Sequence, residues 1–161
     1  MYDVDDQALC ERVAEINKNI SVVTIVEDSE AVAVYQKPRV PMMNEKRARG
    51  GLLQMQLWVA MAKSNEDFLG KFCYTMLHWE NSDIFVFVMD KDDNDDDHNN
   101  DNVYSNRSGH RLLSLRIEGK YRHDVLVSKV LNLLRQFRLI EKDSSRNGGT
   151  SSSGSSSRRG L

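Results

Sequence analysis

The chain has 161 residues, with 22 basic and 24 acidic side chains and a formal net charge of −2 at pH 7. This balance excludes a general attraction to nucleic acid or to acidic lipid. No stretch reaches the roughly 18 apolar residues that span a bilayer, and the N-terminal MYDVDD does not have the pattern of a signal peptide. We expect a cytoplasmic protein without a membrane partner, in which Cys10 and Cys73 are buried thiols.

The N-terminal part of the chain predicts a helix followed by a β-hairpin. Apolar residues recur at helical spacing from Leu9 to Ile16, and Asp5 or Asp6 can cap this helix. The β-branched run Ile20–Val26 is typical of a strand, and a polar turn leads from it to a returning strand, Ala31–Tyr35.

The middle of the chain predicts a long apolar helix. Pro38 and Pro41 exclude regular structure before it, and Asn44 can cap its first turn. The pair Gly50-Gly51 weakens the helical pattern by about 1 kcal/mol per glycine relative to alanine. Beyond the glycines, Leu52–Ala62 is apolar on most faces, which indicates a helix that is largely covered.

The C-terminal part predicts three strands and a closing helix. The strands are Lys71–Trp79, Ile84–Met89 and Arg111–Ile117, and Asp124 can cap the helix. In the first of these strands, strict alternation places Phe72, Tyr74, Met76 and His78 on one face, and Cys73, Thr75, Leu77 and Trp79 on the other.

These elements define an α+β fold in the order α-β-β-α-β-β-β-α, with a five-stranded, mostly antiparallel sheet flanked by helices. We assign residues 9–142 to this domain, with a polar insertion at 90–109 between two strands. Residues 1–8 and the Ser/Gly/Arg-rich residues 143–161 are expected to be flexible, because such compositions cannot offset the entropy of ordering.

The layout resembles a known family. Between Ile20 and Asp90, a strand pair precedes a proline-containing loop, a Met/Leu-rich helix, a Tyr-containing strand and a short apolar strand. With the closing segments RLLSLRI and VLVSKVLNLLRQF, this order resembles an uncharacterised family of small proteins from ammonia-oxidising archaea. That family is similar in layout to roadblock/LC7 domains, which share a profilin-like sandwich. The chain departs from the family where small, glycine-rich residues are often found, at Gln36, Lys37 and Arg39.

The resemblance implies a non-catalytic protein-interaction module. Roadblock domains dimerise through the helix and strand in the middle of the chain, and they serve as platforms for GTPases or motor complexes. For this chain the resemblance implies a homodimer, or a heterodimer with a similar domain, and a small GTPase as a further class of partner. It supplies no site residues and no cofactor.

The residue content of the long helix favours the same interface. Its apolar side chains exceed what one sheet face can cover, and Trp and Met are enriched in interface cores. The candidate interface residues on this helix and the following strand are Leu52, Met55, Trp58, Val59, Met61, Tyr74 and Met76. The alternative is a helix that is fully buried within a monomer.

The acidic segment raises the question of calcium binding. The spacing of oxygen ligands in a calcium loop is matched by Asp90, Asp92, Asn94, Asp96 and Asp101. However, Asp95 replaces the glycine of the sharp turn, and Asp101 is one methylene shorter than the glutamate that binds with both oxygens. We therefore predict a solvated insertion, with a small-molecule or cation-sensing domain as the alternative function.

No catalytic motif is present in the sequence. The four histidines never fall four residues apart, and there is no nucleophile elbow, P-loop or dinucleotide fingerprint. Basic residues gather before the long helix and near the last strand, but no aromatic residues are interleaved with them. We expect no enzymatic activity, no metal, no cofactor and no nucleic-acid partner.

Overall fold

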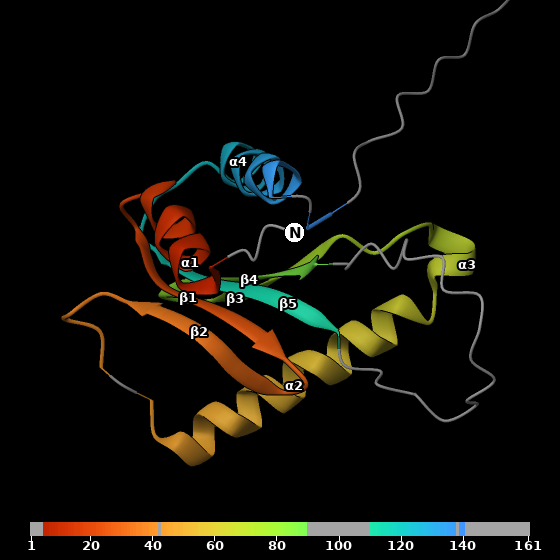
Figure 1. Cartoon of the computed structure of the whole chain (residues 1–161), viewed down its shortest axis with the longest axis horizontal. Helices are drawn as coiled ribbons and strands as arrows, with labels where there is room; N and C mark the ends of the chain where they lie inside the picture. The colour runs from red at the N-terminus through yellow and green to blue at the C-terminus, as the bar shows by residue number, and fades with distance from the viewer. Residues whose placement is uncertain (1–4, 42, 90–109, 138, 141–161) are drawn as a thin grey trace, which may run out of the picture.

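A computed structural model describes residues 5–41, 43–89, 110–137, 139 and 140. They form an antiparallel sheet in the order β2-β1-β5-β4-β3, with α1 and α4 on one face and α2 on the other (Figure 1). The strands are β1 Ile20–Glu27, β2 Glu30–Gln36, β3 Tyr74–Trp79, β4 Ser82–Met89 and β5 Arg111–Glu118. The predicted α+β fold with a five-stranded antiparallel sheet is confirmed. None of the helices within the described ranges has the length and hydropathy needed to cross a membrane.

Helix α1, Asp6–Glu15, begins directly after its cap. The Asp5 carboxylate accepts hydrogen bonds from the backbone N–H groups of Gln7 and Ala8, at 3.0 and 3.4 Å. These bonds satisfy two of the four amides that a helix start leaves without an intrahelical partner. The predicted cap at this position is therefore confirmed, and the helix starts inside the stretch 1–8 that composition assigns to a flexible N-terminus.

The β1–β2 hairpin closes through two residues in the left-handed region. Asp28 and Ser29 have φ angles of 51° and 66°. Two successive positive φ angles give a turn whose twist matches that of the flanking strands. β1 then lies between β2 and β5, which explains why its sequence is rich in β-branched residues on both faces.

The main core lies between the sheet and the two helices α1 and α4, His123–Gln136. The rings of Phe85 and Phe87 stack along β4 with centroids 6.2 Å apart. The fully buried side chains that the three central strands contribute to this core are Ile20, Val23, Ile25, Phe85, Phe87, Met89, Leu113, Leu115 and Ile117. Side chains from helices of the same chain therefore cover this side of the sheet.

The structure corrects three sequence predictions around β3. This strand begins at Tyr74 rather than at Lys71, so the alternation does not extend back to Phe72, which packs on the opposite face, against the residues under α2. Cys73, which lies just before this strand, is exposed rather than buried. A short helix, α3 Glu66–Leu69, lies in the segment between the predicted helix and strand, where the sequence Asn65-Glu66-Asp67 indicates only a break.

The start of α4 also differs from the prediction. The cap position is Arg122, and Asp124 is the second residue of the helix rather than its cap. The Asp124 carboxylate accepts a hydrogen bond from the Arg122 guanidinium at 2.8 Å. An acidic residue in the first helical turn stabilises the positive end of the helix dipole, so Asp124 favours this helix start without capping it.

Candidate interaction surface

Helix α2, Glu45–Lys63, runs without a break along one face of the sheet (Figure 1). The side chain of Asn44 accepts a hydrogen bond from the N–H of Lys46 at 2.9 Å, which confirms the predicted cap. Apart from the adjacent residues and the nearby backbone of the helix itself, no described atom lies within 4 Å of the position where a Cβ would stand at Gly50 or Gly51. Packing therefore does not require either glycine, and the helix continues through both because its second half docks on the sheet.

The inner side of α2 packs on one end of the sheet. Val59 is 1% exposed, and the half-buried side chains of Leu52 and Met55 lie beside it. The amide of Gln56 donates to the carbonyl of His110, just before β5, at 2.9 Å. The strands contribute the buried side chains Val26, Val86, Val88 and Leu112. This second cluster fixes which side of the helix faces the sheet.

The outer side of α2 presents a row of large apolar side chains to solvent. Leu53, Leu57 and Met61 are 54%, 56% and 69% exposed. Their spacing of four residues places them along one face of the helix, and we call them the α2 stripe. Single exposed apolar side chains are common on protein surfaces, whereas a contiguous row on one element marks an interaction site.

Further apolar groups are exposed in the segment that follows α2. Phe68 and Leu69, on the short helix α3, lie almost entirely in solvent. β3 comes next and forms an edge of the sheet, with Met76 and Trp79 exposed along it. No strand in the described part of the chain pairs with the outer side of β3. An edge of this kind offers unpaired backbone groups to another strand.

The predicted interface residues differ in their exposure to solvent. Those that face the interior of the chain, buried or half-buried, are Leu52, Met55, Val59 and Tyr74. Met61 and Met76 are exposed, and Trp58 is half-buried. Leu53 and Leu57 are exposed but are not among these candidates, because both sides of the helix are apolar and the periodicity does not reveal which side the sheet covers.

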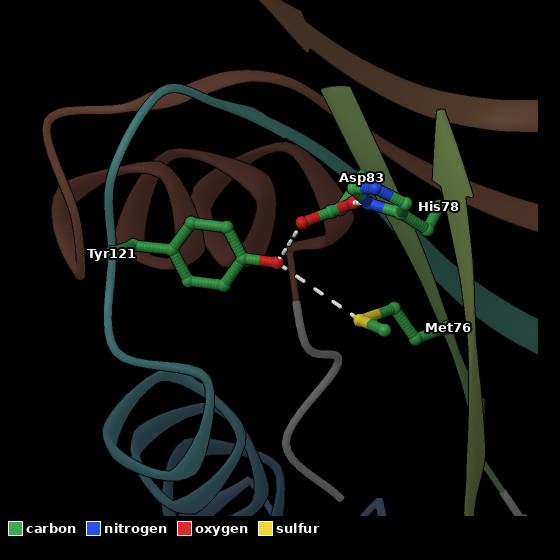
Figure 2. A network of polar contacts seen from close by, with 4 residues as sticks. All are labelled: Met76, His78, Asp83 and Tyr121. Carbon is green, nitrogen blue, oxygen red and sulfur yellow. Dashed lines mark hydrogen bonds and ion pairs between the residues drawn. The ribbon is translucent and has the colours of Figure 1, made fainter. Parts of the chain in front are cut away.

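A polar network joins the β3–β4 hairpin to the connection between β5 and α4 (Figure 2). The hydroxyl of Tyr121 donates to one oxygen of Asp83, and Nδ1 of His78 lies 2.5 Å from the other. The same hydroxyl is 3.9 Å from the sulfur of Met76. The Tyr121 ring packs edge-on against Phe85, with centroids 6.0 Å apart. The network therefore fixes the loop before α4 to the edge of the sheet.

The protonation states of this network are set by its internal hydrogen bonds. Burial alone would raise the pKa of Asp83, but the bonds from Tyr121 and His78 hold that pKa below its ordinary value. Burial and the bond to Asp83 raise the pKa of Tyr121 far above its ordinary value, so the phenol remains a donor. The polar groups of this network form hydrogen bonds with one another, and none of them is an activated nucleophile. We therefore interpret the network as a structural link between the hairpin and the loop before α4.

Metal binding has no support in the described ranges. There, no three His, Cys, Asp or Glu side chains lie close enough together to hold an ion. A hollow of about 390 Å³ at the β3–β4 turn is lined partly by His78 and Asp83, which already bond to each other. The candidate calcium ligands lie outside the described residues, and they are Asp90, Asp92, Asn94, Asp96 and Asp101.

This α+β arrangement, with a five-stranded antiparallel sheet and helices packed on it, matches solved roadblock/LC7 domains. No family model and no curated protein matches the sequence. Among solved structures, the chain is similar to a roadblock/LC7 domain from Streptomyces avermitilis, with 10% identity and a TM-score of 0.58. That match covers 83% of this chain and 95% of the other.

Two further neighbours of known structure are MglB proteins. MglB from Myxococcus xanthus is 9% identical, with a TM-score of 0.58 over 85% of this chain and 94% of that one. The gliding protein MglB from Thermus thermophilus is 10% identical, with a TM-score of 0.57 over 84% of this chain and 92% of that one. At these identities the likeness shows the fold alone, and the resemblance to an archaeal family stays a prediction.

Proposed function

We propose that this chain is a non-catalytic protein-interaction module, which associates with a second roadblock-like domain through the α2 stripe and the open edge of β3. The main support is the exposure of three large apolar side chains in one row, on a helix whose other side is already packed. Each square ångström of apolar surface removed from water contributes about 25 cal/mol, so covering this row by a partner is favourable.

The β3 edge sets the relative orientation of the two associated domains. Two antiparallel β3 strands can satisfy the outward backbone groups of both edges. Met76 and Trp79 then lie within the contact, and residues of these types are enriched at the centre of interfaces. The partner that fits is a second copy of this chain or a domain with the same exposed helix and edge.

A small GTPase is a narrower proposal that rests on the family resemblance. In that proposal the dimer acts as the platform, so a variant that cannot dimerise should also lose the GTPase. A cation-sensing role has no supporting observation among the described residues, and the chain's candidate ligands for it lie outside them.

The proposal is tested by comparing two matched methionine variants. Met61 lies in the α2 stripe and Met43 in the loop before the helix, and they are 69% and 63% exposed. We expect the unaltered chain and Met43→Arg to be dimeric by light scattering, and Met61→Arg to be monomeric, because a charge in an apolar contact loses its hydration. Circular dichroism should show the same folded content for all three.

Two results would contradict this proposal for the homodimer. One is an unaltered chain that stays monomeric at all concentrations, and the other is a Met61→Arg chain that still dimerises. The heterodimer is tested separately, by mixing the chain with roadblock-like domains from the same organism and measuring whether Met61→Arg prevents association.

A further inference from the structure

The edge of the sheet opposite β3 is also open. β2 pairs with β1 on one side, and no strand within the described ranges lies on its other side. Edge strands are commonly protected by lysine, proline or an inward-facing charge. The central residues of β2, Ala31–Tyr35, contain none of these. The pairing with β1 has a bulge at Val32, which leaves Ala33–Gln36 as the regular part of the edge.

Two valines make this edge apolar. Val32 is 47% exposed and Val34 is 43% exposed, whereas Ala33 between them is buried in the core under α1. Val34 lies opposite Thr24 of β1, on the face that α2 only partly covers. β-branched side chains of this kind pack well against those of an adjacent strand.

The backbone of β2 is oriented for pairing through Val34. The N–H of Lys37 donates to the carbonyl of Ser21 at 3.0 Å, so the backbone groups of Lys37 face β1. Because these groups alternate along an antiparallel strand, those of Tyr35 also face β1. The N–H and C=O groups of Val34 and Gln36 therefore point outward from the sheet.

The two ends of β2 have opposite charge. Asp28 and Glu30 lie at the hairpin end, and both are exposed. Lys37 and Arg39 follow the other end of the strand. A second β2 in parallel orientation would place like charges side by side, whereas an antiparallel one places the acidic end of each strand beside the basic end of the other. The edge is thus complementary to itself in one orientation.

We propose that β2 pairs antiparallel with β2 of a second copy of this chain, across a twofold axis at Val34. In this register the two Val34 residues are directly opposite, and the hairpin end of each β2, with Glu30, comes beside the end of the other that leads to Lys37 and Arg39. The contact uses the edge far from β3 and does not depend on the α2 stripe. With both contacts present, copies join through alternate edges into an extended array.

Cysteine cross-linking tests the register, in a Cys73→Ser background. Paired residues in an antiparallel ladder have Cα atoms about 5.5 Å apart, within the range of a disulfide. Val34→Cys should therefore cross-link two copies. Val32→Cys is the matched control, with similar exposure, but its two Cα atoms lie four residues apart along the strands, at about 14 Å. We expect cross-linking at least about tenfold faster for Val34→Cys.

Three additional variants of the Val34→Cys chain separate this contact from other causes of cross-linking. Val34→Cys combined with Leu57→Arg should cross-link at the same rate, which distinguishes failure here from failure of the α2 contact. Arg39→Glu should slow cross-linking, and Glu30→Arg combined with Arg39→Glu should restore it. Equal rates for the two cysteines, or no recovery in the charge-exchanged chain, would overturn the proposal.

Discussion

On the α1 and α4 face of the sheet, twenty buried residues of the described ranges form one core, whereas on the α2 face only five do. Two helices pack on the first face and bury most of its apolar side chains. On the second face a single helix buries only Val59 of its own residues and leaves the α2 stripe in water. The first face is stabilised within one chain, whereas the second has apolar surface that one chain does not cover.

This difference assigns separate roles to the two faces. Substitutions on the α1 and α4 face should lower the free energy of unfolding, whereas those on the outer side of α2 should change association with little effect on folding. Substitutions on each face can test whether folding stability and association are separated in this way.

The largest effect on stability is expected from Leu115→Ala. Leu115 is fully buried in the core under α1 and α4, and the cavity left there should cost about 2–5 kcal/mol of unfolding free energy. Leu57→Ala, the matched change in the α2 stripe, should cost less than about 0.5 kcal/mol in a monomeric background such as Met61→Arg. Urea denaturation measures both, and equal losses would show that the two faces do not differ as proposed.

The two cysteines should differ in reactivity by more than about a hundredfold. Burial in the α1 core raises the pKa of Cys10 to about 11, so little thiolate forms at pH 8. Cys73 is exposed at the β3 edge and should react with an alkylating reagent at once. Mass spectrometry should count one modified thiol in the native protein and two in denaturant. Rapid native modification of Cys10 would show that the α1 core opens readily.

Tyr121→Phe should lower stability by about 1.5–3 kcal/mol at neutral pH, because a half-buried hydrogen-bond donor to a charged acceptor is lost. The folded pKa of Asp83 lies below its ordinary 3.8. A lowered carboxyl pKa stabilises the fold above the unfolded value, and the gain is lost as the pH falls through the folded value. The difference between Tyr121→Phe and the unaltered chain should therefore shrink at pH 3. Urea midpoints at pH 7 and pH 3 measure it, and a constant difference would exclude this linkage.

Val59→Ala should cost less than Leu115→Ala, about 1.6 kcal/mol for two buried methyl groups. Val59 is the anchor of α2 on the sheet, so its loss should loosen the helix and also weaken dimerisation. Hydrogen exchange of α2 amides measures the loosening, with α4 as the internal reference. Faster exchange throughout the protein, rather than in α2 alone, would mean that both faces unfold together.

Local sequence signals predicted most of the elements. The cap at Asp5, the β-branched run of β1 and the apolar periodicity of α4 each depend on neighbouring residues, and all three are observed. The errors lie where a boundary depends on distant contacts. β3 starts late because its paired register with β4 begins at Tyr74, and the exposure of Cys73 just before it depends on which groups the fold packs beside that residue.

The candidate interface was only partly predictable for a related reason. The sequence by itself determined that α2 is a helix with more apolar residues than one sheet face can cover. It did not determine which side faces the sheet, because both the Leu52, Met55, Val59 row and the α2 stripe have helical spacing. That choice was made by the tertiary structure, in which Val26, Val86, Val88 and Leu112 fit the first row and leave the second in water.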